Sequence, residues 1–333
     1  MQNYLEIYTQ VRIFASPKPK NLFTNHLIYS VMNAFQTTIK NIATGKGNLT
    51  EKRAAIVQLG IPYRDACYLV RMYNPVNTRS PRAKKFTYTF GVEIECFLNR
   101  NRVLRDMDSK GVAYQWDGYY SHTNGNSDFR FKSDSSIARS NNINSDNNAI
   151  ECVSPVLQSK DGFDTLKKCC DALYENGAQV NKSTGLHVHI GAGEMTDSHY
   201  CNIFVNYYYL QDLINSFLAP SRRNSRWARR LESGVLTATT KSQIARALGN
   251  DRYHAVNAEA LTMHGTVEFR QHQGSVEYTK ISNWVKFLAA LVEWSKDNRL
   301  DHNVTSLDDC KFLSKELKEY YNNRIAHFQA VAA

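Results

Sequence analysis

The sequence predicts an α+β protein, and two kinds of segment support this. Apolar and polar residues alternate in FTYTFGVEIECFL (86–98), as in a strand, whereas apolar residues recur at helical spacing in DGFDTLKKCCDALYENG (161–177). Segments of both kinds follow one another in mixed order from Phe86 onward. Neither the GxxxxGK(S/T) phosphate loop nor the GxGxxG dinucleotide fingerprint is present, which argues against a P-loop or Rossmann site.

Composition indicates a globular protein, and its positive charge is compatible both with anionic partners and with a merely solvated basic surface. Of its 333 residues, 42% are hydrophobic and 22% are charged, which is ordinary for a folded protein. No apolar run approaches the roughly 18 residues that span a bilayer, and the polar start does not resemble a signal peptide, so we expect no membrane association. Seven cysteines without a CxxC pair indicate reduced thiols and a cytoplasmic protein. The net charge of +10 suits nucleotides, nucleic acids or acidic substrates.

The first 80 residues are predicted to form a helical N-terminal extension (1–80), followed by one domain over residues 81–333. Apolar residues recur at helical spacing within 24–43, Thr50 is placed to cap a second helix, and Pro62 is placed to open a third. This arrangement is also compatible with a helix-turn-helix, but an ordinary helical hairpin is the favoured interpretation. The segment NPVNTRSPRAKK is predicted to be a linker or an exposed connection.

From residue 99 to 148 the pattern predicts loops around short strands such as DFRFKS, and then a regular series of elements. Pro155 is expected to end a strand and Gly177 to end a helix, because proline lacks a donor and glycine tolerates the left-handed C′ position. A long helix is predicted to follow Asp197. In chain order, the strands are expected at 86–98, 149–157, 183–191 and 265–276, and the helices at 161–177, 197–217 and 281–295.

The strand STGLHVHIG carries two histidines where aliphatic residues would pack more easily. Because side chains alternate between the two faces of a strand, His187 and His189 lie on one face and their aliphatic neighbours on the other. Taken alone, such a pair is compatible with a half-exposed strand whose histidines face water. The alternative is the polar floor of an active site, since imidazole binds metals and donates hydrogen bonds to phosphate.

Other strands also carry charged residues on one face. In TVEFRQH, the side chains of Glu268, Arg270 and His272 are predicted to lie on the same face of the strand. Each strand alone could be a solvated edge. Together they favour a site that holds ATP phosphates, because carboxylates with imidazole suit Mg²⁺ or Mn²⁺ and arginine suits phosphate oxygens. The carboxylates are Glu93 and Glu95 in GVEIEC, Glu151 in AIECV and Glu268 in TVEFRQH.

An arginine-rich segment, PSRRNSRWARR, lies between the histidine strand and the Glu268 strand. It is compatible with the solvated face of a basic helix. The alternative is a phosphate pocket lined by arginine, for which Arg222 and Arg223 are the candidates because the guanidinium group grips phosphate oxygens with two parallel hydrogen bonds.

The order of these motifs resembles the amidoligase family. FGVEIEC, SDSSI, IECVSPVL, GLHVHIG, PSRRN and GTVEFRQHQGS occur in the family's order and approximate spacing. The family belongs to the carboxylate–amine ligases, with glutamine synthetase and glutamate–cysteine ligase. The resemblance implies a glutamine-synthetase-like curved, mainly antiparallel sheet with helices packed on its convex side. It also implies a ligase that uses ATP and Mg²⁺ (or Mn²⁺) and forms an amide or isopeptide bond through an acylphosphate.

The resemblance further implies roles for individual residues. One of His187 and His189 would join the metals while the other touches phosphate. Asp134 and Ser136 match the family's DGS element, with Ser135 in place of its glycine, and Asp134 would orient or deprotonate the amine. The transferred phosphoryl group would be steadied by Arg222, Arg223 and Arg270. The metal ligands would be Glu93, Glu95, Glu151, Glu268 and one histidine, for which His187 is the choice.

Two other functions are compatible with the sequence. One is a phosphotransferase that keeps ATP and metals on the same fold, and the other is a non-catalytic nucleic-acid-binding or structural protein on a retired ligase fold. The presence together of both histidines, the paired glutamates and Glu268 with Arg270 favours an enzyme. We therefore expect small-molecule or peptide carboxylate and amine substrates, and nucleic acid is the less favoured partner.

Overall fold

The computed structural model describes residues 34–35, 37–46, 49–61, 66, 88–117 and 128–332. The chain forms two compact units, Met1–Lys84 and Lys85–Ala333. Among the helices of the described residues, none is both long enough and apolar enough to cross a membrane.

The first unit is helical where it is described. Residues 37–44 are helical, and α3 (Leu49–Val57) begins one residue before Thr50, which therefore lies inside the helix rather than at its cap. The helix predicted to open at Pro62 and the predicted linker lie outside the described residues, so the N-terminal extension stays a prediction. The buried residues of this unit form a small core of their own, made of Ile39, Ala43, Ile56, Ile61 and Ala66.

The second unit is built on an open, mostly antiparallel sheet, as the α+β prediction requires. The strand order is β2-β3-β4-β1-β6-β8-β7, and β5 pairs with β1 beyond the end of β4. Of the pairs formed, only β2 and β3 run parallel within the described sheet. The strands are β1 (Thr89–Leu98), β2 (Tyr114–Trp116), β3 (Phe129–Ser133), β4 (Asn148–Val153), β5 (Leu157–Gln158), β6 (Gly185–Gly191), β7 (Val256–Asn257) and β8 (Thr266–Gln273).

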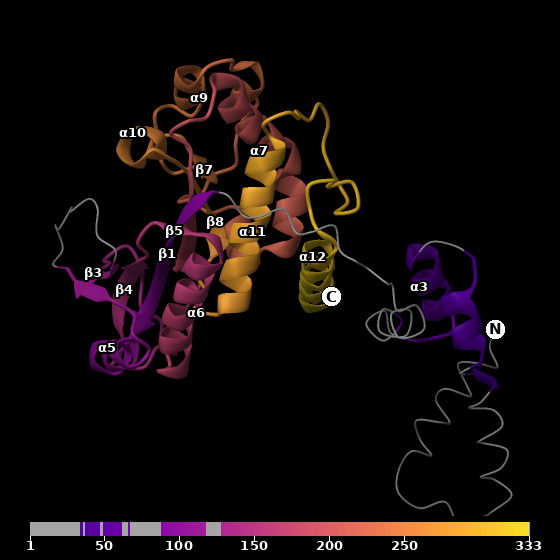
Figure 1. Ribbon diagram of the computed structural model, residues 1–333, viewed down its shortest axis with the longest axis horizontal. Coiled ribbons are helices and arrows are strands. Elements are labelled where there is room, and N and C mark those ends of the chain that lie inside the picture. Colours follow the sequence, from indigo (N-terminus) through magenta and orange to yellow (C-terminus); the bar gives the residue numbers. More distant parts are fainter. Residues whose placement is uncertain are drawn as a thin grey trace, which may run out of the picture. The chain divides into compact units, whose positions relative to one another are not determined.

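Helices pack on one face of this sheet (Figure 1). Val92, Ile94 and Cys96 of β1 are fully buried against them, because alternate residues of the strand are apolar. The long helix α11 contacts α6, α7 and strand β6. The helices of this unit are α5 (Arg100–Ser109), α6 (Ser159–Glu175), α7 (Asp197–Phe217), α8 (Pro220–Arg223), α9 (Lys241–Ala247), α10 (Ala260–His264), α11 (Tyr278–Trp294) and α12 (Lys315–Ala332), with a 3₁₀ turn at Ser233–Thr237.

The predicted elements of this unit are confirmed within a few residues. The long helix begins at Asp197 after Thr196, whose side chain accepts a hydrogen bond from His199 N and caps it. The helix predicted to end at Gly177 ends at Glu175, and Gly177 has the left-handed φ of 70° that glycine tolerates. Near Pro155 the strand is interrupted, and the chain pairs with β1 again as β5.

Candidate functional site

The sheet face away from the helices carries the charged residues of three central strands. Register places Glu93 of β1 directly opposite His187 of β6, and His189 opposite Glu268 of β8. On the other side of β1, Glu95 lies opposite Glu151 of β4. Because directly opposed residues on one face lie close together, four strands bring these side chains into one cluster.

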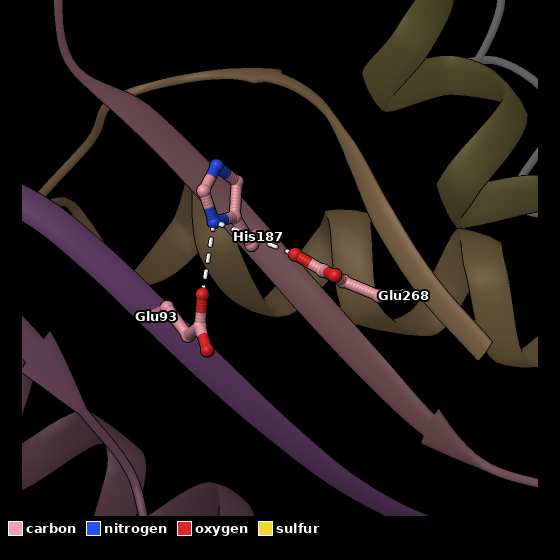
Figure 2. Close-up of side chains that lie close together, drawn as sticks. All are labelled: Glu93, His187 and Glu268. Atoms are coloured by element: carbon pink, nitrogen blue, oxygen red, sulfur yellow. Dashed lines mark hydrogen bonds and ion pairs between the residues drawn. The ribbon is translucent and has the colours of Figure 1, made fainter. Parts of the chain in front are cut away.

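His187 is the centre of this cluster. Its Nδ1 lies 2.9 Å from Glu93 Oε2 and 3.6 Å from Glu268 Oε1, and its Nε2 lies 3.5 Å from Glu95 Oε1. Figure 2 shows the carboxylate of Glu93 and that of Glu268 both approaching the ring from neighbouring strands. The side chain is only 6% exposed, so this histidine does not simply face water as an isolated H-x-H strand could have allowed.

His189 lies beside the same carboxylates. Its Nδ1 is hydrogen-bonded to Thr266 Oγ1 at 2.8 Å, and its Nε2 lies 3.4 Å from Glu93 Oε1. The edge of its ring meets His264 at a centroid distance of 5.7 Å. His189 Nε2 is buried without a hydrogen bond of its own, so this atom is available to a ligand.

Glu268 is fixed by two donors. Arg270 Nη1 donates to Oε1 at 2.5 Å, and Asn257 Nδ2 donates to Oε2 at 2.6 Å. Asn257 lies opposite Glu268 on the short strand β7 and is 4% exposed. The sequence analysis missed Asn257, because a two-residue strand has too little alternation to recognise.

A bulge in β8 places His272 on the sheet face opposite to the one predicted. Leu186 pairs with His272 and Val188 with Phe269, so two residues of β8 lie opposite the single residue His187. The bulge turns His272 to the helix side, where its ring lies 5.5 Å from that of Trp284. The prediction that His272 shares a face with Arg270 is therefore wrong, whereas Arg270 itself faces the site.

The two arginines predicted for phosphate lie elsewhere. Arg222 is 3% exposed and donates to the carbonyl oxygens of Arg270 (2.6 Å) and Gln271 (3.3 Å), the two residues of the bulge. Arg223 donates to the Leu218 carbonyl and lies over the ring of Phe328. Neither lines the cavity described below, although the guanidinium group of Arg222 lies near Gly185 beside Glu95 and His187. Arg222 instead hydrogen-bonds to the bulge, after which His272 lies on the opposite face from Arg270.

Burial and neighbouring charges together shift the pKa values of the side chains in the cluster. Burial and the neighbouring charge of Glu93 raise the pKa of Glu151 to about 9. Burial also opposes the ionisation of Glu93, but the neighbouring imidazoles of His187 and His189 hold the pKa of Glu93 well below its usual range. The charge of Glu93 in turn raises the pKa of His189 in spite of burial. A second negative charge beside Glu93 is therefore unfavourable, and a cation bound between Glu93 and Glu151 would relieve that repulsion.

A cavity of about 930 Å³ opens above the cluster. It is lined by Glu93, Glu95, Glu151, His187 and His189, and also by Asp134 and Ser136 of the SDSSI loop. Asp134 accepts a hydrogen bond from Ser136 N at 2.8 Å, which fixes its carboxylate in the loop. Cationic side chains on the cavity wall are Arg130, Lys132, Arg252 and Arg270.

Three of these cations were missed from the sequence. Arg130 and Lys132 alternate in DFRFKS, which places both on one face of β3, and this pattern could have identified them. Arg130 forms an ion pair with Asp117, and Lys132 lies opposite Glu151. Arg252 lies in the loop before β7, where the sequence gives no periodic signal.

Two sets of side chains have the chemistry of a divalent-cation site. The first is Glu93, His187 and Glu268, and the second is Glu95, Glu151 and His187; within each set the candidate ligand atoms lie within 4.8 Å of one another. Carboxylate oxygens with one imidazole suit Mg²⁺ or Mn²⁺, and the repulsion between Glu151 and Glu93 agrees with that choice. The donor set therefore fits a metal.

Residues 87–292, more than half of the chain, match the model of a family described as "Putative amidoligase enzyme". The chain belongs to the amidoligase family. Membership supports an enzyme of the ligase class. Of the motifs noted in the sequence, FGVEIEC, IECV, GLHVHIG and TVEFRQHQ fall on β1, β4, β6 and β8, the strands that form the cluster. A search of curated proteins finds no match.

Proposed function

We propose that this amidoligase is an ATP- and Mg²⁺-dependent carboxylate–amine ligase that forms an amide or isopeptide bond through an acylphosphate. The observation that carries the proposal is the cluster around His187, in which four carboxylates meet two imidazoles on the floor of a cavity walled by cations. Such a site suits a nucleotide with metal at its phosphates. The substrates would be a small-molecule or peptide carboxylate and an amine.

The two carboxylate–histidine sets would hold the metal ions. Glu93 and Glu268 flank Nδ1 of His187, and Glu95 flanks Nε2. A neutral imidazole has one free lone pair, so His187 serves one set at a time and the other set is completed by oxygen ligands. Mg²⁺ bound there would neutralise phosphate charge and polarise the phosphoryl oxygens of ATP. His189, with its unbonded Nε2, would contact phosphate.

The protein groups would then act on two bond changes. A carboxylate oxygen of the first substrate attacks the γ-phosphorus of ATP, the bond to the β,γ-bridging oxygen breaks, and ADP leaves. The amine nitrogen of the second substrate attacks the acyl carbon, the carbon–oxygen bond to phosphate breaks, and phosphate leaves. Arg270 would stabilise the charge of the transferred phosphoryl group. Asp134, held by Ser136 N, would orient the amine and accept its proton.

The wider setting of the enzyme is part of the same proposal. The sheet would be of the glutamine synthetase type, with ATP on the face away from the helices. The cysteines among the described residues are all buried free thiols, which suits a cytoplasmic enzyme. Arg222 and Arg223 are not included in the phosphate site, since backbone carbonyls occupy their guanidinium groups.

The test is release of phosphate from ATP with Mg²⁺, measured across a pooled panel of amino acids, amines and peptides and followed by mass spectrometry. We expect a product lighter by one water than the sum of its two substrates. Arg270→Lys serves as the impaired variant and Arg223→Lys as the matched control. A product that gains a phosphoryl group would indicate a phosphotransferase instead, and no turnover of ATP with any pool would contradict a catalytic role.

A further inference from the structure

Part of the segment PSRRNSRWARR lies on the surface beside the cavity. Arg226 and Trp227 lie there next to Arg252 and Tyr253, and we call these four residues the arginine–aromatic platform. The two segments are held side by side by backbone hydrogen bonds, from Arg229 N to Tyr253 O at 2.9 Å and back from Ala255 N to Arg229 O at 2.7 Å. The platform is therefore a fixed part of the fold.

The two rings meet edge to face, and each arginine lies over the ring that follows it in the sequence. The rings of Trp227 and Tyr253 lie 5.2 Å apart at 66°, and the guanidinium carbons of Arg226 and Arg252 lie 4.6 Å and 5.1 Å from the centres of the Trp227 and Tyr253 rings. Trp227 is nevertheless 36% exposed, which is unusual for so large an apolar side chain. Stacking orients both guanidinium groups, and Arg252 Nη2 also donates to Tyr253 Oη at 3.4 Å, which leaves its other N–H groups for a ligand.

Among the described residues, carboxylates act on these two arginines only from a distance, since Glu268 and Glu93 influence Arg252 without forming an ion pair with it. Neither Arg226 nor Arg252 forms an ion pair with a carboxylate in the part of the chain that the structure describes. The next arginines of the segment differ, because Arg229 pairs with Asp251 and Arg230 pairs with Asp212 at 2.7 Å. The positive charge is thus confined to the two stacked positions.

The platform continues directly from the cavity. Arg252 lines the cavity wall, and the backbone carbonyl of Trp227 accepts a hydrogen bond from Arg270 Nε at 3.4 Å. A chain whose reacting carboxylate lies near Arg270 would therefore leave the cavity past Arg252 and reach Trp227 and Arg226.

We propose that the platform binds an acidic peptide that extends out of the cavity. The inference rests on the proposed ligase function and names its substrate class: the carboxylate substrate is a peptide with carboxylates beyond the one that reacts. A free amino acid would leave both stacked arginines without a partner. Exposed tryptophan, tyrosine and arginine are also the side chains that contribute most to peptide and protein binding.

A nucleic acid is the less suitable occupant. Its phosphates repeat along the whole strand and need a continuous track of cations. The aspartates that pair with Arg229 and Arg230 interrupt such a track beside the platform. Two separated guanidinium groups with an aromatic surface between them suit a peptide with spaced carboxylates better.

The experiment is fluorescence anisotropy with the full chain, Mg²⁺ and a non-hydrolysable ATP analogue. The probe is a fluorescein-labelled peptide of alternating Glu and Gly, and a Gln–Gly peptide and a labelled oligo-dT serve as comparison probes. We expect Arg226→Gln and Trp227→Ala each to weaken binding of the Glu–Gly peptide by about fivefold or more. Arg230→Gln removes the same charge from the same segment outside the platform and should weaken binding less than about twofold.

Several outcomes would overturn the inference. Equal losses in Arg226→Gln and Arg230→Gln would mean that only net charge matters. Equal binding of the Gln–Gly peptide would remove the role of carboxylates, and tighter binding of oligo-dT with loss in the same variants would assign the platform to nucleic acid. If the variants lost affinity only for the ATP analogue, the platform would instead be a binding site for the adenine base of the nucleotide. Because the assay needs no turnover, intact peptide binding without any phosphate release would count against the proposed function and not against the platform.

Discussion

Buried His272 should make the second unit sensitive to acid, and its position on the helix side of the sheet can be tested through that effect. Burial, together with the charge of Arg324, lowers the pKa of His272 to about 3. The ring lies against Trp284 and is 1% exposed. The unfolded chain, with a histidine pKa of about 6.5, binds the proton first as the pH falls. The stability that neutral His272 allows is therefore complete above about pH 6.5 and is lost progressively as the pH falls toward 3.

The size of the effect follows from these two pKa values. Between pH 7 and pH 5 the unfolded state gains about 2 kcal/mol of protonation free energy at this residue, while folded His272 stays neutral. His272→Phe keeps a ring against Trp284 and removes the titrating group. The free energy of unfolding of the variant, relative to the parent, should therefore rise by about 2 kcal/mol from pH 7 to pH 5.

Urea unfolding followed by tryptophan fluorescence measures this difference. All four tryptophans, at positions 116, 227, 284 and 294, belong to the second unit, so the signal reports on it alone. His302→Gln is the control, because the His302 side chain is 77% exposed and its removal should leave the pH dependence unchanged. Parallel pH profiles for parent and His272→Phe would refute the reasoning. A loss of Mg²⁺-dependent ATP binding in His272→Phe would also refute the reasoning, because it would indicate that His272 lies on the same face as the site.

Three further predictions concern the site. ATP should bind tightly only with a divalent cation, since the carboxylates otherwise repel its phosphates; equal affinity in Mg²⁺ and EDTA by calorimetry would contradict the metal sets. Glu268→Gln should weaken Mg²⁺-dependent ATP binding in a chain that still folds, and Arg270→Lys should lower turnover on the order of 100-fold with little change in ATP affinity, so parent-like kinetics in both would remove their roles. Arg222→Met should cost about 3 kcal/mol in urea unfolding because the bulge carbonyls lose a charged donor, and an equal cost for Arg223→Met would disprove that specific role.

Alternation within single strands could be read from the sequence because it is a local property. Glu93 and Glu95 share a face, as do His187 and His189, since each strand obeys the same two-residue period. The apolar residues between them carry the complementary information, because they require helices on the opposite face. The fold class and most of the cluster followed from these patterns.

Register and irregularity could not be read in the same way. Nothing in β8 alone shows that an extra residue lies opposite His187, yet this bulge moves His272 to the other face. Arg222 depends on the same bulge, because its partners are the backbone carbonyls of the two bulge residues, Arg270 and Gln271. The arginines of this segment therefore led to the prediction of a phosphate site, whereas the contacts of Arg222 are with backbone carbonyls of β8.

The bulge and the buried arginine together explain how one strand serves both faces of the sheet. A regular β8 would place His272 beside Arg270 and would add a third ring to a face that already holds two imidazoles. The extra residue instead gives Arg270 a position on the cavity wall next to Glu268, and His272 a position in the helix core. Arg222 of α8 donates to the carbonyl groups of the two bulge residues. A residue that looks like a ligand of phosphate thus supports the site by holding the strand that carries it.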